Sequence, residues 1–484
     1  MINSYFRQET SELGEVSSSH SPPLGLGYVG TYIKDHSDCE VEIVDPVPQR
    51  LTVEDVLKKA SRADYVGLSC YTDIRFQCFE LAERIKERSP DCVVIVGGPH
   101  VYYLDEAIMR HYPVIDILVR GEGEKTALEI VKGLPLSEIK GITYKIDGRV
   151  ARNPDRPFFE NIDDLYIDYS LLPDMSLYEA DIEAPIDFKK LKTAYLIESR
   201  GCPFKCSYCA NDHWKRTWRA TSGAAIVDKM ERLMKNYGVE YFRFYDDLFT
   251  MNKKRVLEFC EEIKRRGLKV NFRVLVRAGT DREILKALKE AGCESVGFGI
   301  ESGSDAILRR INKGITRQQI IETVRICKDL GLWVVGSFII SLPDETEKDF
   351  RESLSLMKYP DVYMVNVLMI YPYTPFYNEL KAKGEIDDEI WFEKKFPNRI
   401  FYTKDNFSSA SFSNGELEWL KVYCAYYGFI HNPKALFRKH GFGGGVLRFA
   451  LALFDIPLRG RIYALYGRLK ERHLIPKRLL RMRL

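Results

Sequence analysis

The chain has 484 residues, of which 45% are hydrophobic and 29% charged, and its formal net charge is +3. This length allows two or three domains with sizeable cores, and the composition excludes a disordered or fibrous protein. The charge is uneven: residues 433–484 hold 13 Lys and Arg but two Asp and Glu, a net +11 that leaves −8 for the rest. No run of about 20 apolar residues predicts a membrane span.

The 11 cysteines are scattered along the chain and odd in number. The first 20 residues are polar and Ser-rich, so we expect no secretory signal. Both observations favour reduced thiols over a disulfide framework and predict a cytoplasmic protein.

Residues 1–140 alternate short apolar runs with helix-like stretches, which predicts an α/β domain with a doubly wound, Rossmann-like parallel sheet. The strand candidates are Val41–Val44, Tyr65–Cys70, Val93–Val96 and Ile115–Val119. Ligands of such sheets bind at the carboxyl ends of the strands. Small residues at these ends suit a large flat ligand, although they equally suit tight turns. The candidates there include Ser69, Tyr71, Thr72, Gly97, Gly98, Pro99, His100, Gly121, Glu122 and Gly123.

The remaining chain divides into three parts. Residues 141–190 read as a connector, and residues 376–484 as a mainly helical region with a basic end. Between them, residues 191–375 resume the strand–helix alternation with six strand candidates, which predicts a partial (β/α)6 barrel rather than a closed eight-stranded one. The six candidates are Thr193–Glu198, Tyr241–Tyr245, Asn271–Val276, Ser295–Ile300, Val334–Ile340 and Val365–Met369.

Three cysteines directly after the first of these strands form the sharpest motif of the chain. Cys202, Cys206 and Cys209 are spaced so that one loop can bring all three thiolates to one metal centre. Iron–sulfur clusters usually take four thiolates, so three ligands on a four-iron cluster leave one iron open. A zinc site completed by His213 stays open as an alternative.

Cys202, Cys206 and Cys209, together with the aromatic Tyr208, resemble the C-x3-C-x-aromatic-C motif of the radical S-adenosylmethionine superfamily. The segments Pro22–Tyr28, Gly97–His100 and Arg120–Glu124 resemble the cobalamin-binding domain that precedes this motif in one large subfamily. The resemblance covers about residues 20 to 375, and the order of the motifs is more specific than any one of them.

The resemblance implies that the three cysteinates hold a 4Fe–4S cluster whose open iron binds S-adenosylmethionine, which is then cleaved to a 5′-deoxyadenosyl radical. It implies that S-adenosylmethionine contacts come from the cluster loop and the later strand ends. The residues at matching positions are Tyr208, Asp246, Arg277, Glu301, Ser337 and Ile339. Arg273 and Arg277 suit a carboxylate, but they could equally be charges of the barrel rim.

For cobalamin, the resemblance implies contacts from Leu24 and from the strand ends named above. The stretch Asp45–Arg50 lacks the histidine that ligates cobalt in other cobalamin domains. This implies base-off cobalamin without a histidine ligand, with His100 near the corrin. Because relatives open with a full apolar strand, we expect the first strand, near Met1–Phe6, to be short.

The resemblance implies a cobalamin-dependent radical C-methyltransferase, acting on a small-molecule or lipid-like substrate and needing an electron donor such as flavodoxin or ferredoxin. A radical cyclase, similar to the anaerobic cyclase of chlorophyll biosynthesis, shares every motif. A non-catalytic cobalamin sensor is a third reading, but it needs neither an open iron nor an adenosine pocket.

The basic C-terminal stretch from Val446 allows two interpretations. Its apolar residues suit a helical cap on the barrel, whereas its charge suits peripheral contact with an anionic membrane. It lacks the aromatic–basic interleaving of known nucleic-acid-binding folds, which argues against a nucleic-acid partner.

Overall fold

The computed structural model describes residues 1–4, 21–178, 191–393 and 398–431. The N-terminal domain is a six-stranded sheet in the order β1-β2-β3-β4-β5-β6, parallel up to β4 and antiparallel beyond it. Its strands are β1 (Ile2–Asn3), β2 (Tyr65–Ser69), β3 (Val93–Gly97), β4 (Ile117–Val119), β5 (Ile142–Ile146) and β6 (Arg149–Arg152). Its helices are α1 (Leu24–His36), α2 (Val53–Ala60), α3 (Arg75–Arg88), α4 (Val101–His111) and α5 (Glu124–Val131).

Alternating side chains of the central strand β3 divide the helices between the two faces of this sheet. Val94 and Val96 pack into a core that includes residues of α2, α3 and α4, whereas Ile95 packs with Ile130 of α5. Because side chains of a strand alternate between faces, this pattern produces the doubly wound arrangement that the sequence predicts.

The edges of the N-terminal sheet differ from the prediction in two places. The predicted strand Val41–Val44 supplies a single bridge, Val44 to Ile2, and the two-residue strand β1 takes the position next to β2. At the other edge, β5 and β6 lie within the segment read as a connector. They form an antiparallel hairpin with Asp147 and Gly148 at positive φ in its turn, so the sheet extends past residue 140 and is mixed rather than wholly parallel.

The second sheet is an open, wholly parallel half-barrel, as predicted, in the order β14-β13-β12-β11-β10-β7. Its strands are β7 (Thr193–Leu196), β10 (Tyr241–Phe244), β11 (Asn271–Val276), β12 (Cys293–Glu301), β13 (Trp333–Ile340) and β14 (Val362–Val367). The helices between them are α6 (Gly223–Tyr237), α7 (Lys253–Arg265), α8 (Arg282–Glu290), α9 (Asp305–Arg310), α10 (Arg317–Asp329) and α11 (Glu347–Leu356).

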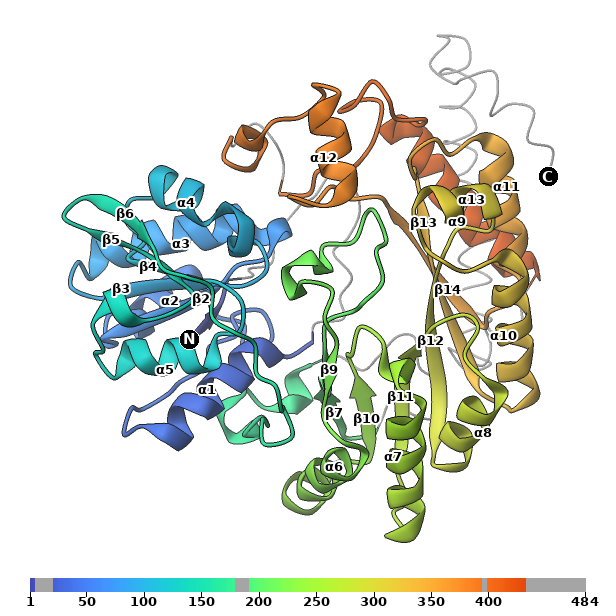
Figure 1. Cartoon of the computed structure of the whole chain (residues 1–484), viewed down its shortest axis with the longest axis horizontal. Helices are drawn as coiled ribbons and strands as arrows, with labels where there is room; N and C mark the ends of the chain where they lie inside the picture. Colours follow the sequence, from blue (N-terminus) through green and yellow to red (C-terminus); the bar gives the residue numbers. More distant parts are fainter. Residues whose placement is uncertain (5–20, 179–190, 394–397, 432–484) are drawn as a thin grey trace.

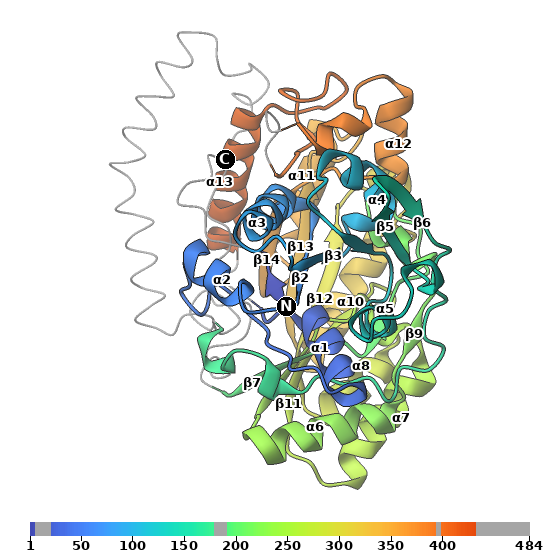
Figure 2. The ribbon, with the colours of Figure 1, turned by 90° about the vertical axis from the view of Figure 1, so that its left-hand side faces the viewer.

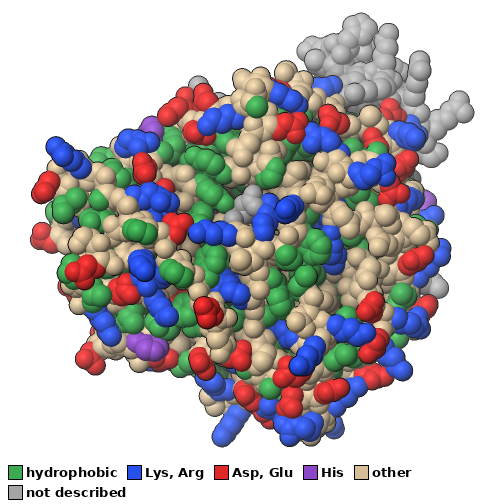
Figure 3. Space-filling model, viewed as in Figure 1, with side chains coloured by type: hydrophobic (Ala, Val, Ile, Leu, Met, Phe, Trp, Pro, Cys, Tyr) green, Lys and Arg blue, Asp and Glu red, His purple; other side chains and the backbone are tan. Residues whose placement is uncertain are grey.

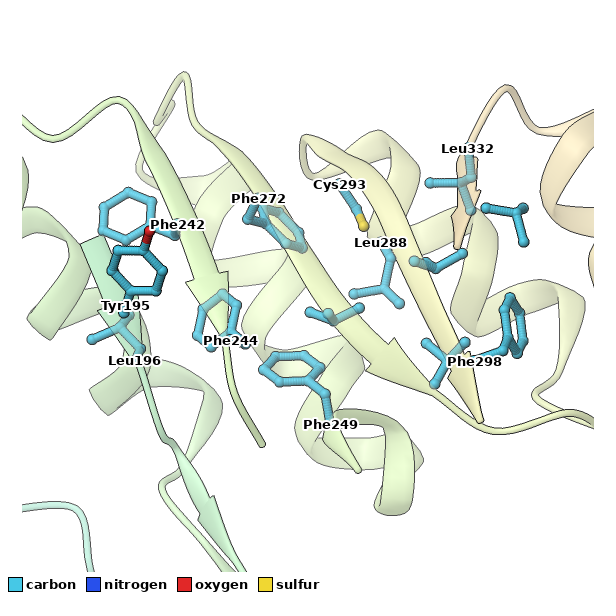
Figure 4. Packing of buried hydrophobic residues seen from close by; sticks show 14 of the residues in the cluster. Tyr195, Leu196, Phe242, Phe244, Phe249, Phe272, Leu288, Cys293, Phe298 and Leu332 are labelled. Carbon is cyan, nitrogen blue, oxygen red and sulfur yellow. The ribbon is translucent and has the colours of Figure 1, made fainter. Parts of the chain in front are cut away.

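The outer face of this half-barrel holds its helices through an apolar layer. Phe244 and Phe272 of neighbouring strands make edge-to-face contacts with Phe259 of α7, with ring centroids 5.7 and 5.4 Å apart. Figure 4 shows this layer along the strands from Leu196 to Phe298. Aromatic pairs of this kind add about 0.5–1.5 kcal/mol each beyond their buried area, so the strand ends rest on a rigid support.

The described part of the C-terminal region touches both domains. It contains α12 (Pro375–Ala382) and α13 (Asn414–His431). Trp391 and Phe376 share a core with the N-terminal sheet, whereas Leu417 and Cys424 of α13 pack into the core of the half-barrel. Figure 2 shows α13 along the side of the half-barrel. The predicted basic tail lies outside the described residues.

The N-terminal sheet and the half-barrel stand side by side, with α12 over the junction between them (Figure 1). The concave face of the half-barrel sheet therefore faces the N-terminal domain. None of the described helices has both the length and the apolar character needed to cross a membrane.

Candidate active site

The cysteine motif lies in a loop with a narrow, well-defined neck. The short strands β8 (Ser199–Arg200) and β9 (Arg219–Ala220) pair antiparallel on either side of it, with Arg200 opposite Arg219. Gly201 opens the loop at φ +85°, where a Cβ would collide with the backbone of Thr217. A glycine is therefore needed for the chain to leave the neck and present Cys202 directly afterwards.

The three thiols of this loop influence one another electrostatically and lie largely out of solvent. Cys206 is buried, and burial raises the pKa of Cys209 to about 11 and raises that of Cys202. Since a metal takes thiolates, loading the site must release protons.

The described residues do not present a preformed site for a single zinc ion. Ligands of a single zinc lie within about 4 Å of one another, because Zn–S bonds are about 2.3 Å long. Among the described residues, no three His, Cys, Asp or Glu side chains converge closely enough to hold one metal ion. His213 instead hydrogen-bonds the carbonyl of Ala210 at 2.9 Å. Thiolates that bind separate irons of a cluster do not need the closer spacing.

Tyr208 of the cysteine loop meets Glu301, the last residue of β12, and Lys313, which follows α9. Lys313 Nζ lies 2.7 Å from Glu301 Oε1 and 3.4 Å from the Tyr208 hydroxyl. Burial, and then the charge of Glu301, raise the pKa of Tyr208 well above its usual range. A Cβ at Gly299 would collide with the Glu301 carboxylate, so this glycine leaves the space that the Glu301–Lys313 pair occupies.

Arg277, just after β11, adds a guanidinium to this group. It lies over the ring of Phe204, 3.6 Å from the centroid, and donates to the carbonyl of Lys313. The turn carrying Lys313 is itself tied to the cysteine loop, because Ser207 N donates to the Ile311 carbonyl at 2.9 Å. The structure thus brings Tyr208, Arg277 and Glu301 together, although Tyr208 and Glu301 lie 93 residues apart in the sequence.

Asp246 lies apart from this group. It is fully buried behind the neck of the loop, where it accepts from Glu198 N at 3.2 Å and lies 3.8 Å from Arg255. Desolvation raises its pKa to about 6 despite the arginine. The neighbouring Asp247 instead acts electrostatically on the thiols of Cys202 and Cys209. We therefore replace Asp246 by Asp247 as the candidate carboxylate at the end of β10.

Ser337 and Ile339 lie on β13, the strand next to β12. Both are partly buried, and they share a face because they are two residues apart. Ser337 pairs with Gly299 in the ladder, which places this face beside the Glu301–Lys313 pair.

The glycine-rich strand ends of the N-terminal domain form one edge. Ser69 pairs with Gly97, and Gly97 pairs with Val119, so the loops after β2, β3 and β4 begin level with one another. Gly98 has φ +115°, and a Cβ there would lie 2.5 Å from the Cys70 carbonyl oxygen. Tyr71 is 46% exposed at this edge, whereas Thr72 is buried.

Three other residues proposed for cobalamin contacts are buried in the protein. Leu24 belongs to the hydrophobic core. His100 is fully buried, with Nδ1 3.2 Å from the Thr72 hydroxyl and its ring 6.0 Å from that of Trp391. Burial, then the charge of Arg75, lower the pKa of His100 to about 3, so its ring is neutral. The Glu122 side chain is hydrogen-bonded to the second domain and to the connector.

Glu122 joins the loop after β4, residues 120–123, to the neck of the cysteine loop; we call residues 120–123 the glycine-rich loop. Its Oε1 accepts from Arg200 Nη1 and from Arg219 Nη1, both at 2.8 Å, and its Oε2 accepts from Phe159 N at 2.6 Å. Arg200 Nη2 also donates to Glu124 at 2.6 Å. The Arg200, Glu122 and Glu124 side chains are less than a tenth exposed. The two loops therefore meet through a buried ionic network.

Comparison with known proteins agrees with this arrangement. The profile of the Radical SAM superfamily matches residues 196–357, and that of the B12 binding domain matches residues 13–131. An uncharacterized methyltransferase of Pyrococcus horikoshii is 37% identical over 372 residues, which cover 75% of this chain and 79% of that protein. The chain belongs to the cobalamin-binding radical S-adenosylmethionine enzymes.

Two other proteins are similar to this radical S-adenosylmethionine enzyme. The anaerobic magnesium-protoporphyrin IX monomethyl ester cyclase of Rubrivivax gelatinosus is 29% identical over 388 residues, covering 77% of this chain and 68% of the cyclase. Among solved structures, the radical S-adenosylmethionine methyltransferase TsrM from Kitasatospora setae, with tryptophan and a S-adenosylmethionine analogue bound, shares the fold. Its TM-score is 0.67 at 19% identity, covering 90% of this chain and 89% of TsrM.

The residues present fit the cofactors of this family, a 4Fe–4S cluster, S-adenosylmethionine and cobalamin. Three thiols on one loop match a cluster with an open iron. The level strand ends, one of which bears an exposed tyrosine, leave an edge that a flat macrocycle can approach. The site of this radical S-adenosylmethionine enzyme also contains Arg200, Arg219 and Lys313, which sequence reasoning missed. The only sequence signal for Arg200 was its position two residues before Cys202.

Proposed function

We propose that the enzyme transfers a methyl group to an unactivated carbon of a small-molecule or lipid-like substrate. The observation that carries this proposal is the shared Glu122, which joins the glycine-rich loop to both ends of the cysteine loop. Methyl transfer needs S-adenosylmethionine and cobalamin near one substrate, and loops that share a buried partner support such proximity. The similarity to an uncharacterized methyltransferase also supports it.

In this proposal Cys202, Cys206 and Cys209 hold the cluster. When bound, the cluster supplies the electron that cleaves S-adenosylmethionine, and cobalamin supplies the methyl group. Arg277, or Lys313 on exchanging its contact with Glu301, faces the carboxylate of S-adenosylmethionine, because cations at this site can bind it.

The other contacts that we propose are polar and apolar surfaces around the adenosyl group. The Glu301 carboxylate accepts from the ribose hydroxyls or the amino group, and the Tyr208 ring lies beside the adenine. Asp247 is our candidate for the amino group at the end of β10. Ser337 and Ile339 flank the adenine from β13.

For cobalamin we propose the edge formed by the loops after β2, β3 and β4. The backbone of Gly97–Pro99 and Gly121–Gly123 and the exposed Tyr71 ring line this edge. The stretch Asp45–Arg50 contains no histidine, and His100 is buried. We therefore propose that no histidine ligates the cobalt.

Substrate and electron donor come from outside the chain. Figure 3 shows hydrophobic side chains gathered in the middle of one face, between the N-terminal domain and the half-barrel. An apolar surface at this junction supports an apolar or partly apolar substrate. Cleaving S-adenosylmethionine consumes one electron, and we propose a flavodoxin or a ferredoxin as its source.

Radical cyclisation without methyl transfer is the second candidate. The similarity to the Rubrivivax gelatinosus cyclase favours it, and the cyclase reading uses the same cysteines. The two functions differ in their products, because methyl transfer converts S-adenosylmethionine to S-adenosylhomocysteine and cyclisation does not.

The test is anaerobic turnover of protein reconstituted with iron, sulfide and hydroxocobalamin, given S-adenosylmethionine, a strong reductant and fractionated cell extract. Mass spectrometry follows 5′-deoxyadenosine, S-adenosylhomocysteine and any extract component that gains a methyl group. Formation of all three supports the methyltransferase, whereas 5′-deoxyadenosine alone supports the cyclase. If protein with a complete cluster forms neither 5′-deoxyadenosine nor S-adenosylhomocysteine, the result contradicts both functions. Cys206→Ala should abolish 5′-deoxyadenosine, and Cys327→Ala, a buried cysteine of α10, should not.

A further inference from the structure

The two loops proposed to hold the cofactors are joined by four charged side chains. Arg200 and Arg219 stand opposite each other at the neck of the cysteine loop, and both donate to Glu122 Oε1 at 2.8 Å. Arg200 also donates to Glu124 at 2.6 Å. We call these four residues the neck clamp. Two carboxylates face two guanidinium groups, so the neck clamp carries no net charge.

Aromatic rings shield the neck clamp from solvent. The Arg200 guanidinium lies 5.2 Å from the centroid of Tyr28, and the Arg219 guanidinium lies 4.6 Å from that of Phe158 and 5.6 Å from that of Trp214. In such surroundings, separating one charge from its partners is strongly destabilising, because the remaining charge stays buried without compensation. Moving the neck without the glycine-rich loop would therefore be energetically costly.

The neck clamp lies close in sequence to both proposed cofactor contacts. Arg200 is two residues from Cys202, and Glu122 lies between Gly121 and Gly123, whose backbone we propose as part of the cobalamin edge. A cluster bound by three cysteines would restrict the motion of the loop between β8 and β9. That restriction fixes Arg200 and Arg219 and through them the backbone at Glu122, so cobalamin then binds a loop that is already ordered.

We propose that the neck clamp couples the two cofactor sites, so that a loaded cluster tightens cobalamin binding, with Arg200 as the positioning residue. This inference rests on the proposed function, because it takes the glycine-rich loop as the cobalamin site. Coupling between sites is reciprocal, so bound cobalamin equally stabilises the loaded cluster.

The test compares the dissociation constant of hydroxocobalamin for cluster-free and cluster-loaded protein, measured anaerobically by absorbance. We expect cluster loading to lower the dissociation constant about tenfold, within the usual range of coupling. In the Arg200→Gln, Glu124→Gln double variant, which leaves no buried charge without a partner, the ratio should fall below its native value, because only Arg219 still joins the neck to Glu122. Hydrogen exchange at residues 121–124 should slow on cluster loading, and more in the native protein than in the double variant.

Two further variants complete the test. Lys34→Gln removes the more exposed ion pair with Asp168, which joins α1 to the segment between the two domains without touching the neck clamp, and should keep the full ratio. If the double variant fails to fold, Glu124→Gln alone removes one of the two carboxylates that Arg200 contacts and should lower the ratio. A ratio that stays at its native value in every folded neck-clamp variant overturns the inference.

The outcomes separate this inference from the proposed function. A native ratio of about one, in protein that binds both cofactors, overturns the coupling and leaves the proposed function intact. Protein that takes up neither cluster nor hydroxocobalamin contradicts the proposed function itself.

Discussion

Lys313 Nζ lies 2.7 Å from Glu301 Oε1, and both side chains are about nine-tenths buried. Glu301 adopts a positive φ of 63° at the end of β12, a conformation that costs energy for a residue with a side chain. Lys313 lies in the turn after α9, a different element. A residue with a strained backbone, such as Glu301, that faces the buried Lys313 ammonium group beside the cysteine loop is expected where a polar cofactor binds.

We predict that Glu301→Gln weakens S-adenosylmethionine binding by about ten- to hundredfold, since a hydrogen bond to a charged group contributes about 1.5–3 kcal/mol. The measurement is the titration of S-adenosylmethionine against the electron paramagnetic resonance spectrum of the reduced cluster. Glu294→Gln is the matched control, because Glu294 lies on the same strand but pairs with Lys289. Equal affinities in the two variants would contradict the assignment of Glu301.

Replacing one cysteine of the triad should remove the cluster without unfolding the domain. We predict that Cys206→Ala retains little iron after reconstitution, because two thiolates cannot hold a four-iron cluster firmly. Iron and sulfide analysis, with absorbance near the cluster bands, measures this loss. Cys327→Ala changes another buried thiol, in α10, and should retain full iron, so iron loss in both variants would point to misfolding instead.

Gly98 should be sensitive to a single added methyl group. Gly98→Ala places a Cβ 2.5 Å from the Cys70 carbonyl oxygen at φ +115°, so the loop after β3 must shift away from β2. We predict that the free energy of unfolding falls by about 1–3 kcal/mol and that hydroxocobalamin binds more weakly. Thermal unfolding and a cobalamin titration measure the two effects.

The matched control for this substitution is Gly133→Ala. Gly133 also has a positive φ, +71°, but no atom lies within 4 Å of a Cβ there. The Gly133→Ala variant should lose only the stability that a positive φ costs a residue with a side chain, and its affinity for hydroxocobalamin should not change. Equal cobalamin affinity in the two variants would argue against the loop after β3 as a contact.

The buried His100 predicts that acid destabilises the fold. Its folded pKa of about 3 lies below the ordinary value of 6.5, so the unfolded chain binds the proton more readily. The stabilisation from the neutral ring is therefore complete above pH 6.5 and is lost as the pH falls toward 3. Between pH 7.5 and pH 5 this group alone should remove about 2 kcal/mol from the free energy of unfolding.

Urea unfolding at both pH values measures this dependence. His100→Gln should reduce the difference between them, because glutamine does not titrate. His111→Gln changes the partly exposed histidine at the end of α4 and should leave the loss due to His100 in place. An unchanged difference in His100→Gln would show that other groups cause the acid dependence.

The fold class could be predicted from the sequence because its signals are local. Apolar runs alternating with amphipathic stretches identify parallel sheets wrapped by helices, and six such runs match the six strands of the half-barrel. The prediction of a strand at Val41–Val44 was wrong, because an apolar run does not show which segment pairs at the edge of a sheet. The hairpin of β5 and β6 was read as a connector for the same reason.

The sequence by itself determined the cysteine triad, because its three ligands lie within eight residues of one loop. Only the tertiary structure decided which of the adjacent Asp246 and Asp247 faces that loop, since neighbouring side chains at a strand end point in different directions. It alone paired Arg200 with Glu122, 78 residues away, because the energy of a buried ion pair depends on distance and burial in the folded chain.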